Sequence, residues 1–107
     1  IFKYFDDKHF TVHQPEVPLV VIIFKTRREF AKYDGGHEGI SGYYSLFSNH
    51  IVFYEESDIS TSDKFTQDEE LGTVAHEGVH QTLANIGVQP RMAVWPAWVT
   101  EGLAEFF

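Results

Sequence analysis

The stretch from Thr66 to Gly87 predicts a long amphipathic helix, and it constrains the fold more than any other part of this sequence. Thr66 and Glu69 form a T-x-x-E capping box, which is typical of a helix start, and Gly87 stands where such a helix would end. Apolar residues recur between them at helical spacing: Leu71, Val74, Ala75, Val79, Leu83 and Ile86. We therefore expect a helix to about Ile86 with one face packed into a core.

A strand and then a short helix are predicted ahead of the long helix. Val17–Phe24 is rich in β-branched residues, which favours a buried strand. Thr26 and Glu29 form another capping box, which opens a short helix that ends by Gly35-Gly36. The beginning of the chain leaves two alternatives open, the last turns of a helix or a strand around Phe10–Val12.

A β-hairpin and a final helix are predicted on either side of the long helix. Ile40–Ser45 and Ile51–Glu55 are short strand-like runs, and the Ser and Asn between them suit a turn. Pro96 suits the first turn of a last helix that carries Glu101 and Glu105. These elements predict the α+β class, with a small mixed sheet packed on the long helix and on the last helix.

The length of the chain predicts one domain. Its 107 residues suffice for a single core and fall short of the range in which two are expected. The chain begins at Ile1 rather than at methionine and stops at Phe107 within an apolar, helix-like run. We therefore expect residues 1–107 to form one domain that is truncated at both ends.

The composition limits which kinds of partner are expected and leaves the cellular compartment open. The formal charge of -8 disfavours binding to a phosphate backbone, so nucleic acid is not expected. The absence of cysteine excludes disulfides and thiolate ligands. No apolar run is long enough to span a membrane, and no signal peptide is visible. The compartment stays open, with a secreted or cell-envelope location compatible with a fragment, and so does the oligomeric state.

The sequence VAHEGVHQ within the long helix carries the clearest chemical pattern. His76 and His80 are four residues apart, so their imidazoles project from one face of the helix within reach of a single ion. A catalytic zinc typically takes three protein ligands and leaves a fourth position to water. Glu101 on the following helix is the predicted third ligand.

Two further glutamates have predicted roles around this ion. Glu77, adjacent to His76, would act as the general base on a water molecule whose pKa zinc lowers to about 7. Glu105 follows Glu101 by one turn and would hold the far nitrogen of a liganding histidine. Other divalent metals remain possible with two histidines and one carboxylate.

The motifs HEGVH and WPAWVTEGLAEFF resemble the zinc helix and the glutamate helix of gluzincin metallopeptidases, including the short minigluzincins. The upstream GYYS and NHIVFYEE resemble the hairpin that precedes the zinc helix in that group. The resemblance implies a zincin-like fold, with His76, His80 and Glu101 as zinc ligands and Glu77 as base. It also implies that the strand Ile40–Tyr44 holds an extended peptide, through Gly42, Tyr43 and Tyr44.

The function expected from these observations is zinc-dependent hydrolysis of peptide bonds in a peptide or protein substrate. The resemblance also implies a further C-terminal subdomain that supplies a Tyr or His donor, and this chain ends six residues after Glu101. A catalytically inactive or latent scaffold that binds zinc and a peptide or protein partner is therefore the alternative, and a helical domain without metal is a third. Substrate sequence and the choice between endo- and exopeptidase action stay open.

The remaining histidines and the tryptophans are expected to have ordinary roles. The other histidines lack ligand spacing: His9, His13, His37 and His50. Trp95 and Trp98 are expected to wedge between the last two helices.

Overall fold

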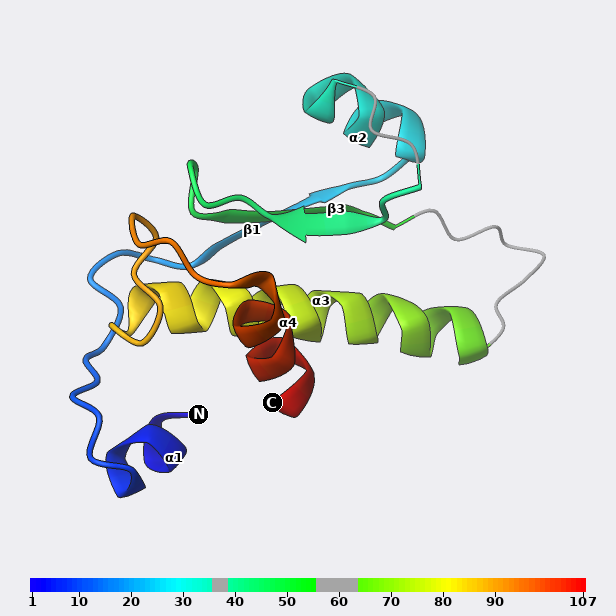
Figure 1. Ribbon diagram of the computed structural model, residues 1–107. Helices are drawn as coiled ribbons and strands as arrows, with labels where there is room; N and C mark the ends of the chain where they lie inside the picture. Colours follow the sequence, from blue (N-terminus) through cyan, green and yellow to red (C-terminus); the bar gives the residue numbers. More distant parts are fainter. Residues whose placement is uncertain (36–38, 56–63) are drawn as a thin grey trace.

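The structure, a computed structural model, describes residues 1–35, 39–55 and 64–107, with the side chains of 64–67 excepted. His37 and the side chain of Thr66 lie outside this described part. The helix that contains Thr66 begins at Lys64, ahead of the predicted start. The elements are α1 (Phe2–Asp7), β1 (Val20–Phe24), α2 (Arg27–Asp34), β2 (Gly42–Tyr44), β3 (His50–Tyr54), α3 (Lys64–Asn85) and α4 (Ala97–Phe106) (Figure 1). The predicted α+β class is confirmed.

The sheet is mixed and has the strand order β1-β3-β2. β3 pairs in parallel with β1 and antiparallel with β2, so the predicted hairpin is confirmed. The connection contains Asn49 with φ of 62°, a conformation that asparagine tolerates better than most residues. β2 lies at one edge of the sheet, as the resemblance implied for this strand.

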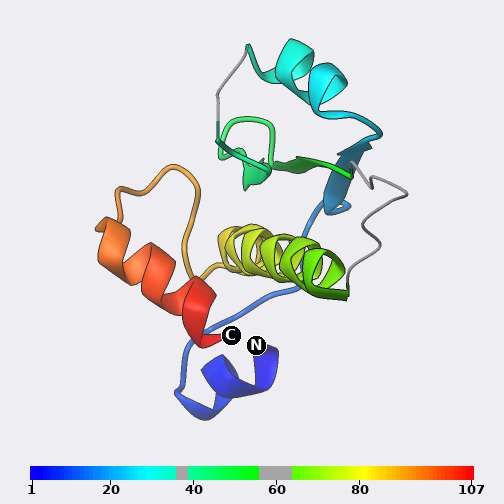
Figure 2. The same ribbon diagram turned by 90° about the vertical axis from the view of Figure 1, so that its right-hand side faces the viewer.

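Helices lie on both faces of the sheet, with α2 on one side and α3 on the other (Figures 1 and 2). The predicted capping box of α2 is confirmed at its start, where the Glu29 backbone N–H donates to the Thr26 hydroxyl oxygen. Gly35 ends α2 in the left-handed conformation. Phe30 packs α2 against the sheet, and its side chain is fully buried among aromatic rings of the strands.

The largest core lies on the far side of α3 from the sheet, where α1, α3 and α4 meet. Its buried members are Phe5, Val79, Leu83, Ile86 and Ala104. The start of the chain is therefore a helix, and no strand forms at Phe10–Val12. The rings of Tyr4 and Phe107 are in edge contact, so the two termini pack against each other. Within the described residues, none of the helices has the length and apolar character that crossing a membrane requires.

The prediction of a buried strand at Val17–Phe24 is wrong in two respects. The strand begins at Val20, and its side chains Val21 and Ile23 are 43% and 57% exposed. The reason is that α3 packs against β2 and β3 but makes no comparable contact with β1. A β-branched sequence therefore indicated the strand correctly and the burial incorrectly.

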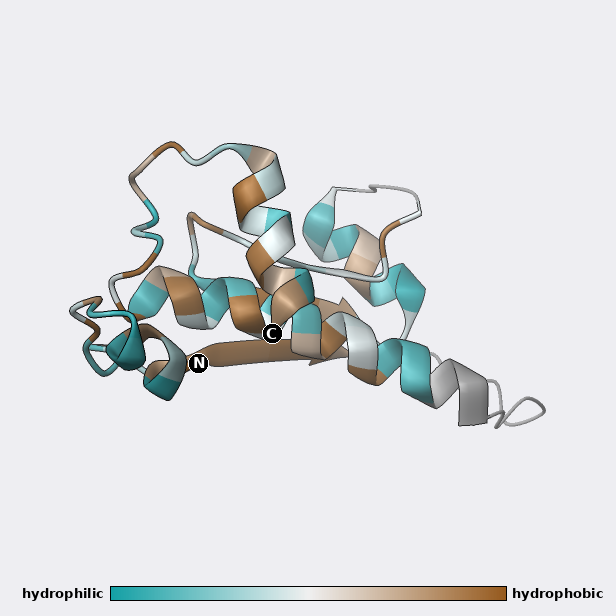
Figure 3. Cartoon of the chain, turned by 60° about the horizontal axis from the view of Figure 1, so that its bottom comes forward, coloured by the Kyte–Doolittle hydropathy of each residue, from teal (hydrophilic) through white to brown (hydrophobic). Residues whose placement is uncertain are grey.

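The last helix does not pack as predicted. α4 contacts α3 and not the sheet, on which it was expected to pack, and it crosses α3 steeply (Figures 2 and 3). The small Ala104 is the α4 residue buried in the core, which permits this close crossing. Trp98 is 79% exposed, so it does not wedge between the helices, and Trp95 is 42% exposed.

Candidate metal centre

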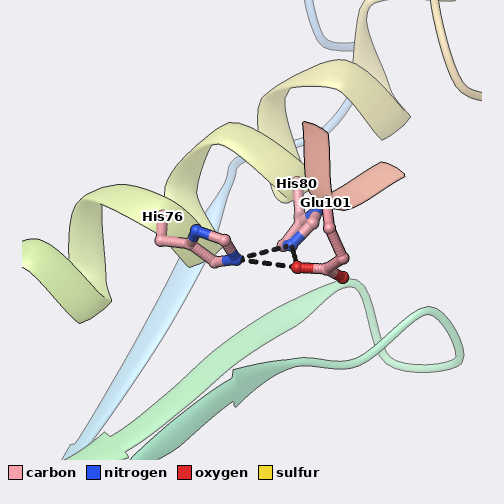
Figure 4. A group of neighbouring side chains, drawn as sticks. All are labelled: His76, His80 and Glu101. Carbon is pink, nitrogen blue, oxygen red and sulfur yellow. Dashed lines mark hydrogen bonds and ion pairs between the residues drawn. The ribbon is translucent and has the colours of Figure 1, made fainter. Parts of the chain in front are cut away.

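Three predicted ligands meet where α4 crosses α3. The His76 Nε2 atom lies 3.1 Å from His80 Nε2 and 3.1 Å from Glu101 Oε2, and His80 Nε2 lies 3.6 Å from the same oxygen. Figure 4 shows the two imidazoles of α3 and the carboxylate of α4 pointing toward one another. All three ligand atoms lie within 4.8 Å of one another.

The separations of these atoms fit a tetrahedral metal ion. Ligand atoms about 2.0–2.1 Å from a tetrahedral zinc lie about 3.3 Å from each other, because they occupy the corners of one tetrahedron. The observed values of 3.1, 3.1 and 3.6 Å scatter around that edge length. Two imidazoles and one carboxylate are also a donor set that zinc accepts in catalytic sites. The residues present therefore fit zinc.

The triad is built from one rigid helix and one crossing helix. The four-residue spacing of His76 and His80 places both rings on the same side of α3, and Glu101 reaches them from an early turn of α4. The His80 side chain is 10% exposed, whereas that of Glu101 is 59% exposed. The cluster is therefore covered by protein around His80 and exposed to solvent around Glu101.

Glu105 lies where a partner for the far nitrogen of a liganding histidine would be expected. Its Oε1 atom is 3.3 Å from His76 Nδ1, on the opposite side of the ring from the nitrogen that faces the triad. A carboxylate in this position favours the tautomer that keeps Nε2 free to bind a metal. The structure thus places Glu105 beside the predicted nitrogen.

Glu77 connects the triad helix to the edge of the sheet. Its Oε2 atom accepts a hydrogen bond of 2.8 Å from the Tyr44 backbone N–H. In the β2–β3 register Ser45 donates to His50, so the alternation of the antiparallel ladder turns the N–H and C=O of Tyr44 outward. The glutamate is therefore fixed to the open edge of β2, next to His76.

Two grooves extend from this point in opposite directions along α3. One has a volume of about 1040 Å³ and is lined among others by Arg27, Tyr54 and Thr73. The other has a volume of about 320 Å³ and extends toward the hairpin connection. His76 and Glu77 line both grooves, so any extended molecule that occupied them would cross this pair.

The three residues proposed from the resemblance to hold substrate lie on β2 but differ in surroundings. Gly42 is buried, and a Cβ there would stand 2.7 Å from the Phe53 Cβ, so the glycine is required by packing against β3. Tyr43 and Tyr44 line the smaller groove. Burial, followed by a hydrogen bond to Asp34, raises the pKa of Tyr43 to about 12, so this phenol stays neutral.

A buried polar network, which the sequence reasoning missed, ties the hairpin to α3. The side-chain amides of Asn49 and Asn85 exchange two hydrogen bonds of 2.7 and 2.8 Å. The Tyr44 hydroxyl donates to the same Asn49 oxygen, and Gln81 donates to the Asn49 backbone carbonyl. Gln81 and Asn85 are four residues apart, so they share one side of α3, and this spacing was the available signal.

This network should contribute measurably to stability, because it joins buried groups. Replacing Asn85 with alanine leaves the Asn49 amide without its partner, and we expect the free energy of unfolding to fall by about 1–3 kcal/mol in urea denaturation. Thr73→Ala on the same helix removes only a partly exposed hydroxyl and should change it by less than about 0.5 kcal/mol. Equal effects of the two substitutions would contradict the role of the network.

The fold and the cluster together define an α+β domain with a candidate two-histidine, one-glutamate metal centre. A family profile described as "Protein of unknown function (DUF1570)" matches residues 70–107, which contain the whole triad. Neither curated proteins nor solved structures gave a match. The description of that family names no activity, so the gluzincin resemblance remains a prediction. Among the described residues, His9, His13 and His50 join no comparable cluster.

Proposed function

We propose that this chain is a gluzincin-like metallopeptidase that hydrolyses peptide bonds with zinc held by His76, His80 and Glu101. The observation that carries the proposal is the convergence of these three ligand atoms at tetrahedral separations, directly beside Glu77 and an open strand edge. Each part could arise in an unrelated protein. Their combination is what a metal-dependent attack on an extended peptide requires.

The protein residues have separate tasks in this proposal. A zinc ion bound here would polarise a carbonyl group and lower the pKa of water to about 7. Glu77 accepts a proton from the attacking water and donates it to the leaving nitrogen. Its hydrogen bond to the Tyr44 N–H holds one carboxylate oxygen at the strand edge, so that the group does not rotate freely. Glu105 keeps His76 in the metal-binding tautomer.

The edge of β2 provides a place for an extended substrate. Gly42 and Tyr44 occupy the outward-facing positions of the ladder, and Glu77 takes the Tyr44 N–H. Gly42 is buried, so the Tyr44 carbonyl is the remaining outward group of an accessible residue at which a peptide could add as a further strand. A peptide bound in this way would lie along the two grooves that His76 and Glu77 share.

Peptide cleavage by purified, zinc-loaded protein tests this proposal. We expect a diverse peptide mixture, followed by mass spectrometry, to show cleavage that stops when a chelator removes the metal and returns when zinc is added. Cleavage that continues after complete metal removal would contradict the proposal. Metal-loaded protein that cleaves nothing in a broad mixture would instead favour a scaffold that only binds zinc and a partner.

A further inference from the structure

Among the described residues that line the smaller groove, one is a lysine or arginine. Its walls include Tyr44, Leu46, Trp95 and Ala93, and Arg91 is the lysine or arginine that reaches it. Glu77 and Glu101 stand at the other end, beside the triad. The groove therefore has a cationic side chain away from the triad.

The Arg91 side chain is anchored but keeps most of its donors for another molecule. Its Nη1 donates to the Leu46 carbonyl at 3.0 Å and to the Phe47 carbonyl at 3.5 Å, which positions the guanidinium against the hairpin connection. Within the described residues it forms no ion pair with a carboxylate. A guanidinium has five N–H donors in a planar fork, so a carboxylate could still be bound through two of them.

Two further side chains of the groove, Gln89 and Tyr44, also favour a ligand with hydrogen-bond acceptor atoms near Arg91. The Gln89 side chain is buried, lines the groove, and its Nε2 donor has no hydrogen-bond partner among the residues that the structure describes. Burial raises the pKa of Tyr44, and the nearby positive charge of Arg91 acts in the opposite direction. An unpartnered buried donor and a cation that line the same groove suit a ligand that brings oxygen atoms.

We propose that this groove binds a carboxylate of the peptide substrate, either an acidic side chain or a free C-terminus, with Arg91 as the residue that determines this specificity. The inference rests on the proposed function, because it takes the ligand to be a peptide that lies across His76 and Glu77. The overall charge of -8 would repel acidic peptides elsewhere on the surface. A preference for them therefore needs a local cation, and away from the triad Arg91 is the cationic side chain that the described residues of the groove supply.

Binding to the zinc-loaded Glu77→Gln protein tests the inference without depending on turnover. The probes are fluorescent alanine-based peptides that carry one Glu or one Gln at each position in turn, and the same peptides with a free or an amidated C-terminus. We expect one Glu peptide, or the free acids, to bind about 10- to 100-fold more tightly than the neutral partner. The two peptide series distinguish a side-chain carboxylate from a terminal one.

The Arg91→Gln substitution should abolish the tighter binding of the acidic peptide relative to its neutral partner. The affinity for the neutral peptide should stay nearly unchanged. Arg28→Gln is the matched control, because Arg28 is exposed on α2, lines neither groove and changes the charge equally. Arg28→Gln should preserve the tighter binding. An equal loss of affinity for acidic and neutral peptides in Arg91→Gln would overturn the proposal, because Arg91 would then only brace the hairpin connection.

Failure of this inference can be told apart from failure of the proposed function. Cleavage of peptides without preference for a carboxylate overturns the specificity and leaves the peptidase intact. Absence of cleavage with a carboxylate preference that depends on Arg91 supports the groove and contradicts the peptidase. Absence of measurable binding by every acidic peptide overturns the groove.

Discussion

The Glu77→Gln protein is expected to retain zinc and to lose about 10²- to 10⁴-fold in turnover, the range that a positioned general acid–base group contributes. Glutamine has nearly the shape of glutamate, and its amide oxygen can still accept the Tyr44 N–H. What it cannot do is accept a proton from water at neutral pH. The effect should therefore appear in kcat, with the fold and the metal content preserved.

The matched control for this variant is Glu55→Gln. Glu55 is exposed, and the replacement causes the same change in charge. Its side chain lines neither groove, so its turnover should equal that of the parent. Unimpaired turnover in Glu77→Gln would remove the assigned base. A loss of zinc in that variant would show that Glu77 supports the metal rather than proton transfer.

The second large effect is expected for His80→Ala, measured as zinc affinity by competition with a chelator. Its imidazole is the least exposed ligand of the triad, and its removal leaves one histidine and one glutamate. We expect a larger loss than for Glu105→Gln, for which the loss of a carboxylate behind a ligand typically costs about 10- to 100-fold. Zinc should also cease to raise the melting temperature, because stabilisation by a ligand follows its affinity for the folded state.

His13→Ala is the control for a general effect of removing a histidine. His13 lies outside the triad, and its Nδ1 contacts the neighbouring Gln14 carbonyl. Its replacement should leave zinc affinity unchanged. Equal zinc affinity of the His80→Ala and parent proteins would show that the ion binds elsewhere, and the proposed function would then lose its central observation.

Local signals in the sequence predicted most of the elements correctly. The Thr26 cap and the Gly35 terminator of α2 depend on hydrogen bonds and backbone angles within a few residues, and both are confirmed. The convergence of His76, His80 and Glu101 could also be anticipated. Helical periodicity fixes the relation of the first two, and the connection to α4 is long enough for Glu101 to return to them.

Distant packing decided what these signals could not. A β-branched strand carries no information on whether a helix covers it, so the exposure of Ile23 was not foreseen. The same applies to the crossing of α4 over α3, to the Asn49–Asn85 pair and to the hydrogen bond from the Tyr44 N–H to Glu77. Each depends on how segments far apart in the chain lie in space.

The sequence by itself determined which residues could bind a metal ion, because the periodicity of one helix sets the direction of its side chains. The tertiary structure alone decided which backbone edge lies against Glu77, where the grooves run and that Arg91 stands at the end of one of them. The physical reason is the separation along the chain of the residues that interact. Helix geometry follows from bonds between near neighbours, whereas an interface between a sheet edge, a helix and a loop follows from the burial of surfaces that the whole chain must bring together.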